Sequence, residues 1–144
     1  MKIRLLLTLA ALAIGFALPI SAQEQKAVDP EVRQQIEAVM MKFEEAYNKY
    51  DAPAIAELHT LDAAELRSWQ GWASGRQAIE KRFAADFAGS PGKMSTKLIQ
   101  MYAVGKDVCV ITNTKIGPLK GHAVTIYVPS FPDWKIRMAY VNSL

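Results

Sequence analysis

The segment from residue 94 to the end of this 144-residue chain alternates apolar and polar side chains in steps of two. That period is typical of β-strands, in which successive side chains point to opposite faces. Turn residues divide the segment into four expected strands, over 94–104, 107–116, 122–128 and 134–142. Because connections this short join antiparallel neighbours, the segment predicts an antiparallel sheet whose strands follow one another.

The preceding segment instead repeats apolar residues in steps of three and four, which is the period of an amphipathic helix. Asp29 followed by Pro30 is typical of a helix start, and the apolar stripe behind it continues to Tyr50. Asp51 with Pro53 repeats this start signal. The pattern therefore predicts a long first helix and a second helix of about two turns.

A short hairpin and a third helix are expected between these helices and the sheet. Residues 63–69 and 72–73 read as two strands around a turn. Ser74, with Gln77 three residues later, predicts a capping box at the start of the third helix. Helices first and consecutive strands last indicate an α+β fold, with the helices packed on one face of the sheet.

The N-terminus carries the pattern of a secretory signal peptide. Lys2 and Arg4 precede an uncharged apolar run of 14 residues, from 5 to 18. Spanning a bilayer takes about 20 apolar residues, so the run is expected to be removed and not to anchor the chain. The expected organisation is a signal peptide over 1–22, a polar tail over 23–30 and one domain over 31–144. The protein is then expected to be periplasmic or secreted, with no membrane partner after cleavage.

Charge and composition exclude several classes of function. The chain has 17 Lys and Arg against 14 Asp and Glu, and removal of Lys2 and Arg4 leaves 15 against 14. Nucleic-acid-binding proteins carry a clustered basic excess, so no nucleic-acid partner is expected. The two His and the single Cys109 lack metal-ligand spacing, and the glycines match no dinucleotide or phosphate loop. No metal and no cofactor are therefore expected, and Cys109, in an apolar run, is expected to be buried.

Gly75–Ile79 opens the third expected helix, and Asp133–Met138 with Asn142 forms the last expected strand. With the order of the elements, these segments resemble the nuclear transport factor 2-like superfamily, and within it the SnoaL-like, ketosteroid-isomerase-like group of small exported bacterial proteins. The resemblance implies a cone: a strongly curved antiparallel sheet wrapped around a long N-terminal helix, plus two shorter helices, with a pocket open at one end. It also implies a homodimer formed through the sheet.

The ketosteroid isomerases of that superfamily use a carboxylate base, together with a Tyr and a protonated Asp that bind a developing oxyanion. Carried over to this chain, the Tyr position falls at Phe43, the base near Leu66–Ser68 and the Asp near Thr125–Ile126. None of these residues has the required group. Proton transfer needs a base within hydrogen-bond reach, so the usual isomerase constellation is not expected, nor any carboxylate deep in the pocket.

The strand expected over 63–69 has one charged and one apolar face. Glu65, Arg67 and Trp69 share the first face, Leu66 lies on the second, and either face could line a cavity. A buried Arg67 would clamp a ligand carboxylate, because its guanidinium is a planar, two-pronged donor. The simpler interpretation is an Arg67 that faces solvent beside Glu65.

Two histidines and the last strand supply the remaining candidates. His59 and His122 offer an alternative acid–base pair, although the simpler interpretation is two exposed or already hydrogen-bonded side chains at the ends of elements. On the last strand, Trp134, Tyr140 and Asn142 fall on one large, mostly apolar face. Such a face suits either the core or the wall of a cavity, and Tyr140 and Asn142 are taken as candidates for the wall.

The sequence thus predicts an exported domain that binds a small apolar or amphipathic molecule, with no catalytic residue assigned. Alternatives are an isomerase- or dehydratase-type enzyme acting on a small apolar substrate, and a non-catalytic dimerisation or interaction domain. The residues expected to contact the ligand are Phe43, Tyr47, His59, Arg67, Trp69, Trp72, Met101, Tyr140 and Asn142.

Overall fold

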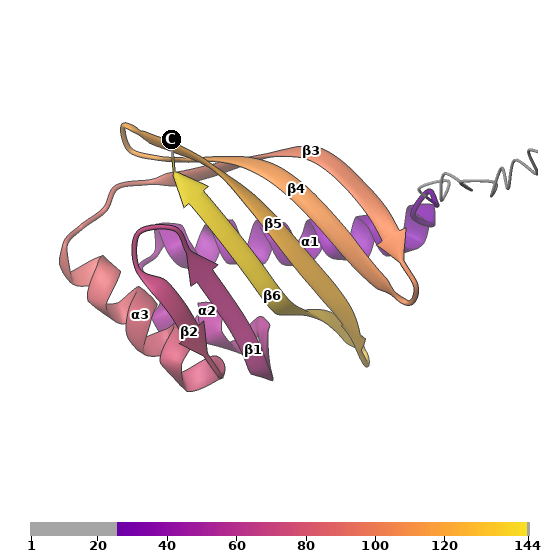
Figure 1. Cartoon of the computed structure of the whole chain (residues 1–144), viewed down its shortest axis with the longest axis horizontal. Coiled ribbons are helices and arrows are strands. Elements are labelled where there is room, and N and C mark those ends of the chain that lie inside the picture. Colours follow the sequence, from indigo (N-terminus) through magenta and orange to yellow (C-terminus); the bar gives the residue numbers. More distant parts are fainter. Residues whose placement is uncertain (1–25, 144) are drawn as a thin grey trace, which may run out of the picture.

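The computed structural model describes residues 26–143 and shows helices on one face of a six-stranded sheet (Figure 1). The predicted signal peptide and the start of the polar tail lie outside the described residues. The helices are α1 (Pro30–Asn48), α2 (Ala52–Glu57) and α3 (Arg76–Ala88). The strands are β1 (His59–Arg67), β2 (Gly71–Ser74), β3 (Met94–Val104), β4 (Asp107–Ile116), β5 (Leu119–Ser130) and β6 (Asp133–Ser143). None of the described helices combines the length and apolar character needed to cross a bilayer.

Two of the three predicted helix starts are confirmed. The Asp29 side chain accepts a hydrogen bond from the Glu31 amide, and the Asp51 side chain accepts one from the Ala54 amide, both at 2.9 Å. The predicted capping box at Ser74 is wrong, because α3 begins after Gly75, with no side-chain cap. Gly75 has φ of +88°, a conformation that favours glycine, so the backbone itself turns the chain from β2 into α3.

The strand order is β2-β1-β6-β5-β4-β3. Strands β3 to β6 pair antiparallel with their neighbours in the chain, as predicted. The prediction of a wholly antiparallel sheet is wrong, because β1 and β6 pair in parallel. These are the first and last strands, so no short connection constrains their relative direction.

A one-residue bulge at Arg137 changes which side chains of β6 face the helices. Ile126 pairs with Met138, while the next residue of β5 pairs with Ile136, so Arg137 is the extra residue. Because strand side chains alternate, one extra residue moves all later side chains to the opposite face. Met138 and Tyr140 are consequently 46% and 40% exposed, and the predicted inward orientation of Tyr140 is wrong.

The buried apolar residues form two clusters. One lies between α1, α2, α3 and the short strands and includes Ile55 and Ile79. The other lies between α1 and the long strands and includes Ile36 and Val110, and Phe43 packs against both clusters. Cys109 is buried and free, as predicted. A cavity lies where the two clusters meet, because its lining draws on residues of both.

Candidate functional site

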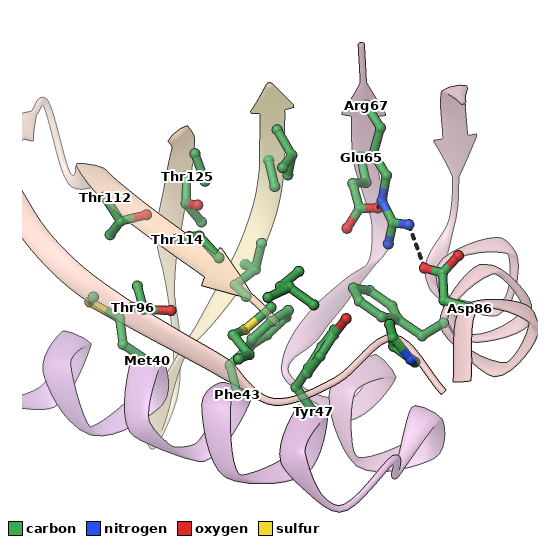
Figure 2. A pocket seen from close by; sticks show the side chains of 18 of the residues that line it. Met40, Phe43, Tyr47, Glu65, Arg67, Asp86, Thr96, Thr112, Thr114 and Thr125 are labelled. Carbon is green, nitrogen blue, oxygen red and sulfur yellow. Dashed lines mark hydrogen bonds and ion pairs between the residues drawn. The ribbon is translucent and has the colours of Figure 1, made fainter. Parts of the chain in front are cut away.

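A cavity of about 270 Å³ lies between α1, α3 and the inward face of the sheet (Figure 2). Its lining is mostly apolar and aromatic, with polar side chains gathered at two ends. The apolar part includes Met40, Phe43, Phe83, Met94, Ile116, Tyr127, Ile136, Ala139 and Val141. The polar part includes Tyr47, His59, Glu65, Arg67, Asp86, Thr96, Thr112, Thr114 and Thr125.

One end of the cavity holds a buried ion-pair cluster centred on Arg67. The Arg67 side chain is turned inward and the residue is only 6% exposed, so the solvent-facing interpretation is wrong. Its Nε donates to Glu65 Oε1 at 2.6 Å, and its Nη1 donates to Asp86 Oδ2 and to Gln70 Oε1, the latter at 2.8 Å. Charged groups removed from water need such partners, and each of these carboxylates has one.

Glu65 is the acidic group that the sequence did not lead us to expect inside the cavity. It is 3% exposed and shares the inward face of β1 with Arg67, two residues later. Arg82 of α3 also binds Glu65: its Nη1 donates to Glu65 Oε1 at 3.4 Å and to the Glu65 carbonyl oxygen at 3.3 Å. The expectation of a cavity without carboxylates is therefore wrong.

Helix α3 contributes both the second carboxylate and an aromatic support. Asp86 follows Phe83 by three residues, which places both side chains on the helix face toward β1. The Arg67 guanidinium carbon lies 4.8 Å from the centre of the Phe83 ring and 5.9 Å from that of Trp69. Cations are attracted to aromatic faces at such distances, so the two rings hold the guanidinium in place.

Tyr47 of α1 points its hydroxyl into the cavity on the side of the charged cluster (Figure 2). Burial, reinforced by the nearby Asp86 charge and opposed by Arg67, raises the pKa of Tyr47 to about 12. The phenol is therefore protonated at neutral pH and can donate a hydrogen bond. Phe83 packs edge-on against Tyr47 and Phe43, with ring centres 6.2 and 5.7 Å apart.

His59, the first residue of β1, is 1% exposed and lines the cavity. Its Nδ1 lies 2.8 Å from the Ile55 carbonyl oxygen, which can only accept, so Nδ1 carries the proton. Burial lowers the pKa of His59, and the ring is neutral at pH 7. His122 is exposed, bonds Asn113 and lies outside this lining, so the two histidines form no pair in the cavity.

The opposite end of the cavity is a wall of four threonines on β3, β4 and β5 (Figure 2). Thr96 and Thr114 are direct cross-strand partners, and Thr112 follows the same face two residues earlier. Sequence reasoning missed this wall. Its signal was the spacing of Thr112 and Thr114 in an otherwise apolar alternation, which places both on one face of a strand.

The nine residues expected to contact a ligand are only partly brought together. Those that line the cavity are Phe43, Tyr47, His59, Arg67 and Trp69. The others are Trp72, which is exposed opposite Leu66; Met101, which packs against the second core cluster; Tyr140, on the outer face; and Asn142, opposite His122. Sequence reasoning missed Glu65, Asp86 and the threonine wall. Asp86 had a signal, since it is a charged residue beside the apolar stripe of α3.

Among residues 26–143, no group of three or more His, Cys, Asp or Glu side chains is arranged to hold a metal ion. The chemistry of the cavity thus rests on two carboxylates, one guanidinium, one imidazole, two phenols and the threonine hydroxyl groups.

Comparison with known proteins identifies the fold. No protein-family model matches the chain, and no curated protein matches it. An NTF2-like (nuclear transport factor 2-like) protein of unknown function from Pseudomonas putida aligns over 81% of this chain and 89% of its own, with TM-score 0.67 and 15% identity. A ketosteroid isomerase-like protein from Erwinia carotovora atroseptica aligns over 81% and 98%, with TM-score 0.69 and 15% identity.

An NTF2-like protein of unknown function from Silicibacter pomeroyi aligns over 82% of this chain and all of its own, with TM-score 0.68 and 14% identity. The chain therefore has the NTF2-like, ketosteroid-isomerase-like fold, as the sequence resemblance implied. At such low identity the likeness concerns the fold, and the site has to be read from its own residues.

Proposed function

We propose that this domain binds a small, mainly apolar molecule that carries a polar group at one end. The observation that supports the proposal is the cavity itself. Its lining is mostly aromatic and aliphatic, and its hydrogen-bonding groups are the Arg67 cluster, the threonine wall, Tyr47, Tyr127 and His59. Ligand sites in proteins combine an apolar lining with a few placed polar groups in this way. The volume of about 270 Å³ suits a compact ligand.

The test is binding of an apolar fluorescent dye to the purified protein, followed by the change in tryptophan fluorescence, to which Trp69 contributes because its indole lines the cavity. Ala139→Leu adds a side chain to the inward face of β6 and is expected to weaken binding at least about tenfold by filling the space. Ala85→Leu, at an exposed position of α3, is the matched control. Dye binding that is equally strong in both variants would contradict the proposal.

A second candidate is an acid–base enzyme of the isomerase or dehydratase type, and the specific observation that favours it is the Glu65 carboxylate inside the cavity. A carboxylate and a protonated phenol on the same cavity are the groups that proton abstraction beside a carbonyl requires. The test is deuterium exchange of the α-protons of a cyclic ketone such as 2-decalone in D₂O, measured by NMR. Exchange that is catalysed by the native chain and lost in Glu65→Gln supports the enzyme. No catalysed exchange would leave binding as the function.

We also propose that two copies pair through the outer face of the sheet. A row of apolar side chains crosses five strands in register, namely Trp72, Leu66, Tyr140, Val124 and Ile111. Tyr140→Glu places a charge in this row and is expected to give a monomer by light scattering. Leu61→Glu, at an exposed position outside the row, is expected to remain a dimer. A native chain that is monomeric would contradict this pairing.

The proposed place of action is outside the cytoplasm. Residues 1–22 support it, because basic residues come first, an apolar run follows, and small residues precede the expected cleavage point. Expression in a bacterial host should yield a periplasmic or secreted protein whose first residue is Gln23. A full-length cytoplasmic product would contradict the proposal.

A further inference from the structure

The two N–H groups of Arg67 Nη2 are available to a ligand in the cavity. Its Nε and both hydrogens of Nη1 are used by Glu65, Asp86 and Gln70. Within residues 26–143, Nη2 donates to no acceptor. Figure 2 shows this guanidinium between the two carboxylates, with the Tyr47 hydroxyl below it in the cavity.

One carboxylate oxygen of Glu65, Oε2, is likewise available to a ligand in the cavity. Its Oε1 receives hydrogen bonds from Arg67 Nε and Arg82 Nη1, while Oε2 receives none from the described part of the chain. The side chain is buried, and Figure 2 shows its carboxylate directed into the open part of the cavity. Because no group of the described chain donates to this oxygen, a ligand in the cavity that supplies a donor can form a hydrogen bond to a charged group there.

The cluster is already balanced in charge. Two carboxylates, Glu65 and Asp86, stand against two guanidinium groups, Arg67 and Arg82. His59 of β1, which also lines the cavity, is neutral because burial lowers its pKa. A ligand carboxylate would be a third anion around a guanidinium that is already paired with two carboxylates, so its binding is disfavoured. A ligand ammonium would be repelled by both guanidinium groups.

We propose, on the basis of the binding function above, that the cavity selects an uncharged ligand whose polar end carries an acceptor next to a donor, such as a primary carboxamide. The carbonyl oxygen accepts from Arg67 Nη2, and the amide NH₂ donates to Glu65 Oε2. Both are hydrogen bonds to charged groups, which are stronger than neutral ones. This assigns Arg67 a different task from clamping a ligand carboxylate, because the protein's own carboxylates occupy that position.

The test compares three probes that share one ring system: 2-naphthamide, 2-naphthoate and naphthalene. At pH 7.5 the acid is fully ionised, since free carboxyl groups titrate near pH 4. Titration of the native chain, followed by isothermal calorimetry, is expected to show the amide binding at least about tenfold more tightly than either other probe. Naphthoate that binds as tightly as the amide, or naphthalene that does so, would overturn the inference.

A substitution at Glu65 should reverse this preference. Glu65→Gln removes one negative charge with little change of shape, so the cluster keeps two guanidinium groups against Asp86 alone. Naphthoate affinity is then expected to rise and amide affinity to fall, which inverts the ratio. Glu37→Gln, in a solvent-exposed pair with Arg33, is the matched control and should keep the native ratio. An unchanged ratio in Glu65→Gln would overturn the inference.

Asp86→Asn provides the same test at a less buried position and serves if Glu65→Gln fails to fold. It should move the ratio in the same direction by a smaller factor, and no movement would overturn the inference.

Failure of this inference and failure of the proposed function are distinguishable. If the apolar dye binds but the amide has no advantage, only the inference is wrong. If neither the dye nor any probe binds, the proposed function is wrong and the inference falls with it.

Discussion

The two polar ends of the cavity are built in opposite ways. The charged end is a network in which Glu65, Arg67 and Asp86 fix one another across β1 and α3, with two aromatic rings against the guanidinium. The threonine wall is a set of hydroxyls on three strands of the sheet. Buried charges have to be paired and are therefore held in one geometry, whereas a hydroxyl rotates to donate or accept. For the ligand proposed above, we therefore expect the charged end to select the polar group and the threonine wall to tolerate variation.

The largest expected effect comes from breaking the charged end at its centre. Arg67→Met keeps an unbranched apolar stem, shorter than that of Arg, and leaves the Glu65 and Asp86 carboxylates without their shared cation. Removing one partner of a buried ion pair typically lowers the free energy of unfolding by about 3–5 kcal/mol. Urea denaturation measures the change.

Arg33→Met is the control for that experiment, because Arg33 forms an exposed pair with Glu37 on α1. Exposed pairs contribute about 1 kcal/mol or less, so this variant should stay close to the native stability. Equal losses in the two variants would mean that the charged end is not an interlocked network.

A smaller effect is expected from pH, through His59 at the start of the same strand. Burial lowers the pKa of His59 in the folded chain, while the unfolded chain takes up a proton near pH 6.5. The unfolded state therefore binds more protons below that pH, and the free energy of unfolding should fall as the pH is lowered from 7 to 5.5. Denaturation curves of His59→Gln should lose this dependence and those of His122→Gln, at an exposed site, should keep it. Identical pH dependence in both variants would contradict the buried, neutral His59.

The smallest effect is expected at the threonine wall. Thr112→Val replaces a hydroxyl on this wall with a methyl group of similar size, and the free energy of unfolding should change by about 1 kcal/mol or less. The preference for 2-naphthamide over 2-naphthoate should also stay the same. A loss as large as that of Arg67→Met would show that the two ends do not differ as described.

Much of the fold could be predicted from the sequence because its signals are local. The side chains of Asp29 and Asp51 mark helix starts by direct hydrogen bonds to nearby amides, and short turns force consecutive strands to pair. The parallel pairing of β1 with β6 and the bulge at Arg137 had no such signal. The parallel pairing joins the first and last strands, which lie far apart in the chain, and the bulge lies within the β5–β6 hairpin and moved Tyr140 to the outer face.

The site was less predictable for a related reason. The alternation of β1 correctly placed Glu65, Arg67 and Trp69 on one face, but it left open whether this face or the face with Leu66 lines the cavity. Asp86, nineteen residues after Arg67, favours the charged face because it accepts a hydrogen bond from the guanidinium. An inward charged face becomes stable only when partners from another element satisfy it, and such a match is visible only in three dimensions.

An experimentally determined structure of the protein with 2-naphthamide bound would test the central claim most directly. The account predicts the naphthalene ring against Phe43 and Phe83, with its carboxamide within hydrogen-bond distance of Glu65 Oε2 and Arg67 Nη2. Side chains filling the cavity, or a ligand held only on the outer face of the sheet, would contradict it.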